Sequence, residues 1–379
     1  MRRLLLFACA IIGVTLFAAP EVSDLKVTPI EPIGLAIDYT VSGATDDGKG
    51  CYLSVSMSVD GTTYVAKSLT GATNCVNGAH RVYWNVAKDG ITLGEADLDV
   101  TVNYDIPLYC VIDLTKGSSA ASYPVIYLNA PPSSGFNTTE YKTTKLVLKR
   151  VDAGTFTMGD SDESDNQPHT VTLTKPFYMG LYEVTQKQWE LVMGSNPCSS
   201  TSYGKGDAYP VHYVSYNDIR GSSEGAKWPT TNSVDATSFL GKLRARTGLD
   251  FDLPTEAQWE YTCRAGTTTT YSHDDSEKGN YMWYWDNSSD GTKVVGTKKA
   301  NPWGFYDMHG NVWEWCLDWY NSSLSGGEDP VGSSSGSGRV ERGGSWGDNA
   351  SSCTSSSRDY YGPSYYDIIF GFRLSRTLP

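Results

Sequence analysis

Two short segments carry the same helix-start signal, and this signal limits the fold more than any other feature of the sequence. In Thr185–Glu190 and in Thr255–Glu260, a threonine is followed three residues later by a glutamine. This is the spacing of the capping box, in which each side chain bonds to the other residue's backbone N–H group. Gly194 and Gly266 follow closely and supply the helix stops. The sequence therefore predicts short helices in an irregular α+β fold rather than a helical bundle.

A third short helix is predicted between these two. Val234-Asp235 supplies its start and Gly248 follows its end. One face carries the apolar residues Phe239, Leu240 and Leu243. The chain also holds 25 Tyr, 11 Trp and 38 Gly, a composition that favours short strands, turns and aromatic contacts. We therefore assign the apolar helix faces to the core and not to a site.

The N-terminus has the pattern of an export signal. Met1-Arg2-Arg3 supplies the positive end, Leu4–Phe17 the apolar stretch and Ala18-Ala19 the small residues at a cleavage site. Residues 1–19 are predicted to be a signal peptide, and the protein is predicted to be secreted, periplasmic or on the cell surface. A lipid anchor at Cys9 is the weaker alternative, because this residue interrupts the apolar run. The remainder has no apolar stretch of the ~18 residues that a membrane span needs.

Charge and histidine spacing narrow the classes of partner. Acidic residues outnumber basic ones by 43 to 30, which gives a net charge of −13. No run of Lys and Arg is long enough to follow a phosphate backbone, so the sequence predicts no nucleic acid partner. The histidines are scattered, and the sequence contains neither a CxxC nor an HExxH motif. The pattern therefore favours neither a zinc nor an iron site.

The first part of the mature chain alternates like β-strands. Tyr52–Val59 and Leu98–Val102 are the clearest strands, and Asp60-Gly61 and Asn77-Gly78 are typical hairpin turns. Strands at this spacing without a helical period predict a small β-sandwich of immunoglobulin or fibronectin type over residues 20–110. No residue set there suggests catalysis, so we interpret it as a spacer or adhesion module.

Cysteines and loop composition complete the division into domains. Cys51 and Cys75 lie in the same strand-rich segment and are predicted to pair, although spacing alone does not fix connectivity. The stretch Gly117–Thr139 is rich in Ser, Pro and Gly. Residues 111–144 are therefore predicted to be a linker. The second domain is predicted over residues 145–379.

This second domain resembles the formylglycine-generating-enzyme (sulfatase-modifying factor) family, because a series of motifs occurs in the family's order. The motifs are Gly154–Gly159 (GTFTMG), Glu183–Thr185 (EVT), Pro210-Val211 with Val214–Tyr216 (VSY), Leu253–Tyr261 (LPTEAQWEY), Trp303–Trp315 (WGFYDMHGNVWEW), Arg342–Trp346 (RGGSW) and Gly371–Arg373 (GFR). The tract around Asn311 is the most specific of them. The resemblance implies an irregular α+β fold related to the C-type lectins.

The resemblance also implies a structural calcium site in the tract Asp307–Glu314. In the family, the matching residues supply side-chain oxygens at Asp307 and Glu314 and backbone carbonyls at Gly310 and Val312. Hard oxygen ligands of this kind suit calcium. The alternative is that the two carboxylates cap turns or pair with Arg342.

Catalysis in the family needs two cysteines, which bind copper and exchange with the substrate thiol. The second position falls on Cys353, but the first falls on Asp348. A carboxylate neither forms a mixed disulfide nor joins a bis-thiolate copper site. Trp313 and Ser345 match the family's catalytic neighbourhood, although packing explains them equally well.

Two thiols elsewhere keep a catalytic alternative open. If Cys316 or Cys263 supplied the missing thiol, the chain would remain a candidate for a copper-dependent oxidase that converts a sulfatase cysteine to formylglycine. Iron-dependent branches of the family use histidines from an added helical domain, whereas the added domain here is predicted to be β.

The C-terminal segment between Trp346 and Gly371 is rich in Ser, Tyr and Asp. This mixture favours adaptable binding surfaces. The segment resembles the variable region of lectin-fold proteins diversified by retroelements, and an ordinary Ser/Tyr-rich turn region is the alternative. The predicted ligand surface consists of Asp348, Asp359, Tyr360, Tyr361, Tyr365 and Tyr366.

Together these features predict an exported, non-catalytic relative of the formylglycine-generating enzymes. It is predicted to bind a protein or glycan through its C-terminal surface.

Overall fold

The computed structural model describes most of the chain outside the N-terminal segment. The described ranges are 21–30, 34–42, 52–59, 62–66, 68–71, 77–91, 99–105, 107–161, 166–200, 202–324 and 326–378. Contacts divide the chain into two compact units, Met1–Pro107 and Leu108–Leu378. The signal peptide predicted at 1–19 and the disulfide predicted between Cys51 and Cys75 lie outside the described residues.

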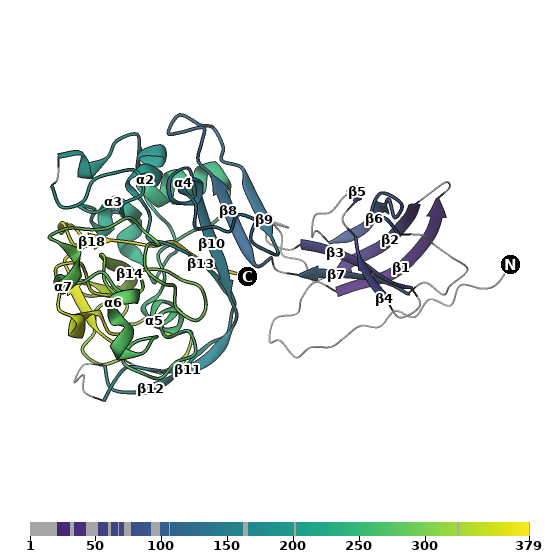
Figure 1. The fold of residues 1–379 in the computed structure, drawn as a ribbon. Helices are drawn as coiled ribbons and strands as arrows, with labels where there is room; N and C mark the ends of the chain where they lie inside the picture. Colours follow the sequence, from purple (N-terminus) through teal and green to yellow (C-terminus); the bar gives the residue numbers. More distant parts are fainter. Residues whose placement is uncertain are drawn as a thin grey trace. The chain divides into compact units, whose positions relative to one another are not determined.

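The first unit consists of two antiparallel sheets that share one core (Figure 1). Its strands are β1 (Glu21–Ile30), β2 (Gly34–Ser42), β3 (Tyr52–Val59), β4 (Thr62–Val65), β5 (Leu69–Gly71), β6 (Gly78–Trp84) and β7 (Asp99–Asp105). The sheet orders are β1-β2-β6-β5 and β4-β3-β7. Leu35 and Ile37 of one sheet pack in the same cluster as Val55 and Met57 of the other. The strands expected at 52–59 and near 98–102 are present as β3 and β7, and the unit is a small β-sandwich.

The segment 111–144, predicted to be a linker, is folded into the second unit. Strands β8 (Tyr109–Asp113) and β9 (Val125–Leu128) pair with each other, and β8 pairs with β10 (Lys145–Val151). Helix α1 (Thr139–Thr143) follows β9. The Ser, Pro and Gly residues form the turns between these elements. The Ser, Pro and Gly content of this segment therefore reflects turns between paired strands and not a flexible linker.

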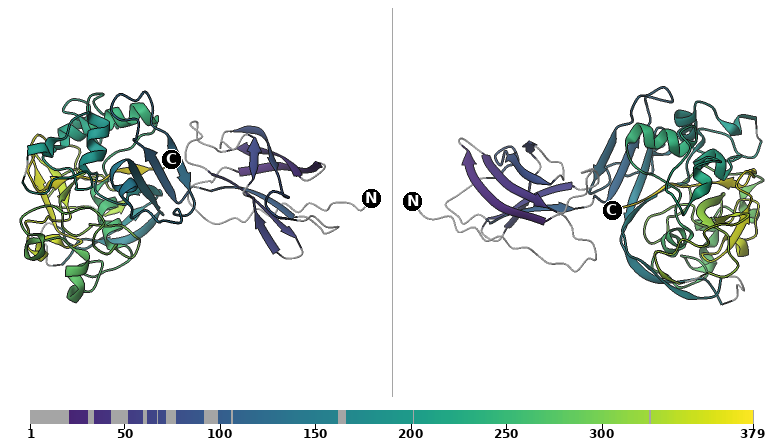
Figure 2. Two further views of the ribbon diagram at one scale, coloured as in Figure 1. Left: turned by 45° about the horizontal axis from the view of Figure 1, so that its top comes forward. Right: turned by 180° about the vertical axis from the view of Figure 1, so that it is seen from behind.

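The second unit combines short strands and short helices (Figures 1 and 2). Its further strands are β11 (Gly154–Met158), β12 (His169–Leu173), β13 (Phe177–Gly180), β14 (Trp313–Trp319), β15 (Gly327–Glu328), β16 (Arg339–Arg342), β17 (Arg358–Tyr361), β18 (Phe370–Gly371) and β19 (Ser375–Thr377). Its further helices are α2 (Gln186–Met193), α3 (Tyr216–Arg220), α4 (Phe239–Thr247), α5 (Glu256–Arg264), α6 (Lys278–Tyr281) and α7 (Trp285–Ser288). Short 3-10 turns lie at η1 (Pro197–Ser200), η2 (Gly225–Lys227), η3 (Asp275–Glu277) and η4 (Ala350–Cys353).

Three sheets organise this unit. Their strand orders are β19-β13-β10-β8-β9, β11-β12-β15 and β17-β16-β14-β18. The last strand, β19, returns to pair with β13, so both ends of the unit belong to one sheet. Figure 2 shows the yellow C-terminal segments returning among elements formed much earlier in the sequence. Such long-range pairings fix the irregular α+β fold that the sequence predicts.

The predicted capping boxes are present at both helices. Thr185 caps α2 and Thr255 caps α5, each with the reciprocal glutamine bond. Helix α4 begins later than predicted, because Ser238 is its N-cap. The Asp235 carboxylate instead accepts hydrogen bonds from the backbone N–H groups of Ser223 and Glu224. The Asp235 side chain therefore stabilises the preceding loop and does not cap helix α4.

The core of the second unit lies between α5 and the surrounding strands. Trp259, Ala257 and Cys263 of α5 pack with Phe177 of β13 and Val340 of β16 in one buried cluster. Helix α5 thus connects the core to the sheet β17-β16-β14-β18, which carries the candidate site.

Among the described residues, no helix is both long and apolar enough to span a bilayer.

Candidate functional site

The tract Trp303–Trp315 reaches β14 through a tightly turned backbone. Asp307 and Asn311 both adopt positive φ, at 56° and 72°. Asn tolerates this left-handed region better than most residues, since its short polar side chain can bond locally. The buried Asn311 amide accepts from the Lys293 N–H at 2.9 Å and donates to Glu183 Oε2 at 2.6 Å. The most specific motif of the sequence is therefore a turn that the hydrogen bonds of Asn311 to Lys293 and Glu183 stabilise.

Glu183, a buried residue of the EVT motif, contacts this tract, and sequence reasoning left it without a role. Its Oε1 accepts the Val312 N–H at 3.1 Å. Burial, and then the neighbouring carboxylates Asp307 and Glu314, raise its pKa well above the ordinary value. Three carboxyl groups therefore lie close enough to influence one another. The EVT motif was the only sequence signal for Glu183, and it gave no indication of this contact.

Glu314 pairs with Arg373. The Arg373 Nε and Nη2 atoms donate to the two oxygens of Glu314, each at 2.6 Å, and the Trp259 indole donates to Oε2 at 2.8 Å. The alternative pairing of Glu314 with Arg342 is wrong at the side-chain level. Although Glu314 and Arg342 are opposite each other in β14 and β16, Arg342 turns to the acids of α5.

Asp307 has one oxygen without a partner. Its Oδ2 accepts the Gly296 N–H at 2.6 Å, whereas its buried Oδ1 has no hydrogen-bond partner in the part of the chain that the structure describes. Burial raises the Asp307 pKa to about 6, and Arg373 and Lys142 act in the opposite direction. Within the described ranges, no group of three or more His, Cys, Asp or Glu residues could hold a metal ion. Of the two carboxylates in the tract, Asp307 thus keeps an unengaged oxygen, whereas Glu314 is paired with Arg373.

Asp348 acts as a hydrogen-bond acceptor at the centre of the family's catalytic neighbourhood. Its Oδ2 accepts from the Trp313 indole at 2.9 Å and from the Ser345 N–H at 3.0 Å. The Ser345 hydroxyl also donates to it, at 2.5 Å. The structure therefore joins Trp313, Ser345 and Asp348 by hydrogen bonds. Their shared contacts are those of a structural turn.

Cys353 lies close by with its thiol fully buried. The thiol contacts the carbonyl oxygens of Ser345 and Asn349 at 3.9 and 3.7 Å. Burial, together with the negative charge of Asp348, raises its pKa far above the ordinary value. A thiol of this kind stays protonated at neutral pH and is a poor nucleophile or metal ligand.

The two other thiols considered for catalysis have different surroundings. Cys263 contacts the Met308 carbonyl at 3.6 Å and the His309 ring at 3.6 and 3.9 Å. Cys316 contacts the Glu314 carbonyl at 3.8 Å. Both are buried, free thiols with raised pKa values. The groups around these two thiols differ from the Ser345 and Asn349 carbonyls that the Cys353 sulfur contacts, so the donor set among the described residues does not resemble a pair of copper-binding thiolates.

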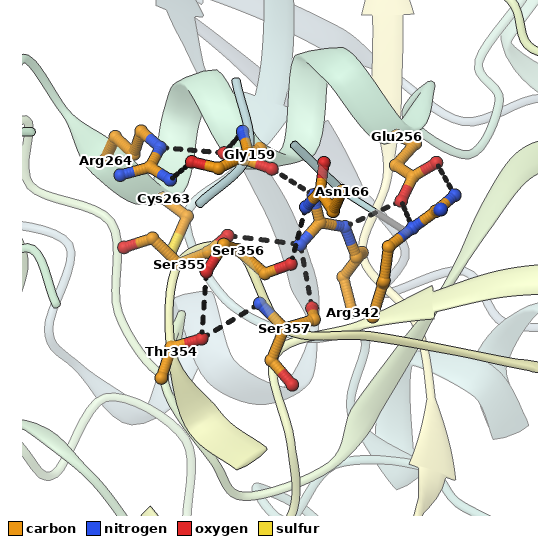
Figure 3. Close-up of polar contacts among 12 residues, drawn as sticks. Gly159, Asn166, Glu256, Cys263, Arg264, Arg342, Thr354, Ser355, Ser356 and Ser357 are labelled. Carbon is orange, nitrogen blue, oxygen red and sulfur yellow. Dashed lines mark hydrogen bonds and ion pairs between the residues drawn. The ribbon is translucent and has the colours of Figure 1, made fainter. Parts of the chain in front are cut away.

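A buried ionic network lies beneath this neighbourhood (Figure 3). Arg342 is fully buried and forms ion pairs with Glu260 and, at 3.1 Å, with Glu256. Arg264 pairs with Glu260 at 2.8 Å, and Arg358 pairs with Glu256 at 2.8 Å. Arg342 also donates to the carbonyls of Ser355 and Ser357, as Figure 3 shows. The network fixes the backbone that leads into the C-terminal surface.

The four predicted tyrosines are exposed. Their exposed fractions are 44% for Tyr360, 37% for Tyr361, 44% for Tyr365 and 59% for Tyr366. Tyr361 and Tyr365 stack on each other with ring centroids 4.7 Å apart, and Tyr360 stacks on Tyr320 at 3.9 Å. The rings are thus ordered by contacts with one another while large parts of their faces remain accessible.

The matches to known proteins agree with this architecture. Residues 135–378 match the model of the sulfatase-modifying factor enzyme 1-like domain. The chain belongs to this family. The family match begins inside the segment predicted as a linker, after strands β8 and β9 and before helix α1.

Proteins of several kinds are similar to this chain. The chain is 34% identical to the chaperone protein LppX of Paenibacillus barcinonensis, over 58% of this chain and 83% of the relative. It is 27% identical to the formylglycine-generating enzyme of Bos taurus, over 61% and 73%. Among solved structures, Treponema denticola variable protein 1 superposes with a TM-score of 0.54 at 31% identity, over 62% of this chain and 96% of that chain. The family's C-type-lectin-like fold and the resemblance to a variable protein are therefore both shown.

Proposed function

We propose that this protein is an exported, non-catalytic member of the family that binds a protein ligand through its C-terminal surface. The observation that carries the proposal is Asp348, which stands where the family's first catalytic cysteine is expected and is fully engaged with Trp313 and Ser345. The exposed tyrosines of the C-terminal segment supply the large, rigid contact faces that binding surfaces use.

The similarity to a variable protein supports a binding role over a chemical one. Ser, Tyr and Asp between Trp346 and Gly371 provide hydrogen-bonding groups and aromatic area on one segment. Retroelement diversification of this segment is a further part of the proposal. The coding DNA tests it: a near-identical template repeat next to a reverse transcriptase gene supports it, and a flank with neither feature contradicts it.

We expect no conversion of cysteine to formylglycine. The full chain, loaded with copper(I) and given a Cys-x-Pro-x-Arg peptide, should yield no aldehyde above background by mass spectrometry. The reason is the chemistry of the donor set, since the Asp348 carboxylate replaces a thiolate and Cys353 is buried with a raised pKa.

The Asp348→Cys variant is the companion measurement for the copper-dependent alternative. It restores a thiol but removes the acceptor of the Trp313 and Ser345 hydrogen bonds. Melting of this variant has to be measured alongside its activity. Aldehyde formed by the unaltered chain would reject the non-catalytic proposal and favour the oxidase.

Calcium binding at Asp307–Glu314 is a separate proposal. The unpartnered Oδ1 of Asp307 supports it, and the carbonyls of Gly310 and Val312 would complete an oxygen-rich set. Calcium would supply a structural cross-link there. The engagement of Glu314 by Arg373 argues for a site in which Asp307 is the main carboxylate.

A chelator should therefore lower the melting temperature of the full chain. A ligand at 100 times its Kd stabilises the folded state by about 2.7 kcal/mol. Differential scanning fluorimetry with calcium and with EDTA measures the shift, and Asp307→Asn should remove the difference. Identical melting curves in the two conditions would count against the site.

A further inference from the structure

Glu341 has a fully buried carboxyl group that forms no hydrogen bond with any described residue. It lies on β16, inside the sheet β17-β16-β14-β18, with an exposed fraction of 0%. Both of its carboxyl oxygens lack a hydrogen-bond partner. The two basic residues of β16 are engaged elsewhere: the adjacent Arg342 pairs with Glu256 and Glu260, and Arg339, two positions away, donates to the carbonyls of Leu317 and Trp228. A buried polar group without a partner is costly, so its retention needs an explanation.

The groups around Glu341 are acidic. Asp359 lies directly opposite it on β17, and residues paired in this way share a face of the sheet. On its other side Glu341 is paired with Trp315 of β14. Burial, and then Asp359 and Asp367, raise the Glu341 pKa well above the ordinary value. Asp348 in turn raises the pKa of Asp359. The acidic set therefore extends from the buried strand toward the surface.

Two of the exposed tyrosines lie beside this acidic set. The pKa values of Tyr361 and Tyr365 are both raised, and Glu341 and Asp367 contribute to both shifts. The Tyr365 hydroxyl also donates to Asp367 at 3.2 Å. The two rings stack on each other and retain exposed fractions of 37% and 44%. Aromatic faces attract cations, and the attraction grows when water is excluded.

We propose that Glu341, Asp359, Asp367, Tyr361 and Tyr365 form a site for a guanidinium group, supplied by an arginine side chain of a protein partner. This inference rests on the proposed binding function and names the chemistry of its ligand. A planar guanidinium offers several donors to dispersed carboxylates and stacks on tyrosine rings. A metal ion fits less well, because no three acidic, His or Cys groups of the described residues are arranged to hold one.

Binding of the cation should release a proton. In the free protein, burial and the neighbouring acids raise the pKa of the Glu341 carboxyl and so favour its protonated form. A bound cation favours the charged form, so the carboxyl O–H bond breaks and the proton passes to the buffer. Affinity should consequently rise with pH. The other titratable groups facing the site are Asp348, Asp359, Asp367, Tyr361 and Tyr365.

Calorimetry on the full chain tests the inference with two matched probes, Nα-acetyl-arginine amide and its neutral isostere Nα-acetyl-citrulline amide. The arginine probe should bind at least about tenfold more tightly, which corresponds to about 1.4 kcal/mol. Titrations in two buffers of different ionisation enthalpy should reveal proton release for the arginine probe alone. Glu341→Gln and Asp359→Asn should each weaken arginine binding about tenfold.

Glu328→Gln is the matched control, because Glu328 is an exposed acid on β15 in another sheet. It removes the same charge and should leave the affinity unchanged. Asp359 is partly exposed, so Asp359→Asn keeps the test valid if Glu341→Gln melts early. Equal affinities for the two probes, or arginine binding that survives both site substitutions, would overturn the inference. The binding function would still stand if a neutral peptide bound in a tyrosine-dependent manner.

Discussion

Replacing Glu260 by glutamine should lower the free energy of unfolding by ~3–5 kcal/mol, the usual cost of breaking a buried ion pair on one side. Glu260 is fully buried, accepts the Gly159 N–H at 2.7 Å and pairs with both Arg264 and Arg342. Removing its charge leaves the fully buried Arg342 with Glu256 as its remaining acidic partner. Urea unfolding of the full chain, followed by tryptophan fluorescence, measures the loss.

The control is Glu224→Gln, which breaks an exposed i,i+3 pair with Lys227. Exposed pairs of this kind contribute about 0–1 kcal/mol, so this variant should unfold almost like the parent chain. A similar small effect for Glu260→Gln would show that the network adds little to stability. In that case the C-terminal surface would be held mainly by the apolar cluster around Trp259.

The pH dependence of stability should change with the same substitution. Although burial acts in the opposite direction, Arg342, Arg264 and the Gly159 N–H bring the Glu260 pKa below its ordinary value of 4.5. When the pKa of an acid is lower in the folded state than in the unfolded state, its ionised form stabilises the folded protein at pH values above the unfolded-state pKa. This contribution is lost as pH falls through the folded pKa. The stabilities of the parent and the variant should therefore converge in acid, and a constant difference down to low pH would contradict this origin.

Local signals in the sequence predicted the elements that depend on neighbouring residues. The capping boxes at Thr185 and Thr255 appear as predicted, because each needs only a glutamine three residues away. The strand at Tyr52–Val59 was readable from its alternation. In contrast, β8 and β9 were missed because the turns around them have the composition of a linker. Their place in the sheet depends on β10, which follows them in the chain.

The chemistry of the candidate site was less predictable, because its partners come from distant segments. Glu314 lies 59 positions before Arg373, and Glu183 lies 128 positions before Asn311. No spacing rule joins such residues. Asp348 could be recognised from a family position, but its contact with Trp313 depends on how the loop that carries Asp348 meets strand β14. Glu341 gave no signal at all, since a single acid in a short strand is ordinarily solvated.

Alanine at Tyr366 should weaken binding while leaving the fold intact. The ligand is a peptide selected on the parent chain from a random displayed library. Tyr366 is 59% exposed, and its ring meets that of Tyr213 edge-on with the centroids 6.4 Å apart. Loss of so little packing should change the free energy of unfolding by within about 0.5 kcal/mol. If the ring is a central contact, its removal should cost the ligand ~2 kcal/mol or more.

Tyr361→Ala separates surface contact from packing. Its ring stacks on Tyr365 and also lies 4.9 Å from buried Phe370, so some stability should be lost with the affinity. Aromatic pairs contribute about 0.5–1.5 kcal/mol beyond their buried area, which sets the expected size of that loss. Tyr83→Ala, at a tyrosine of 43% exposure on β6 in the other unit, is the matched control and should retain full affinity.

Melting and binding measured on the same variants decide the role of these rings. Binding lost at Tyr366 without a change in melting places the ligand on the exposed rings. Large melting losses at most of the four tyrosines would instead show that the rings are part of the core, and the selected peptide would have to bind elsewhere. The exposed fractions argue against this second outcome, because rings exposed by 37–59% leave much of their area outside the packed interior.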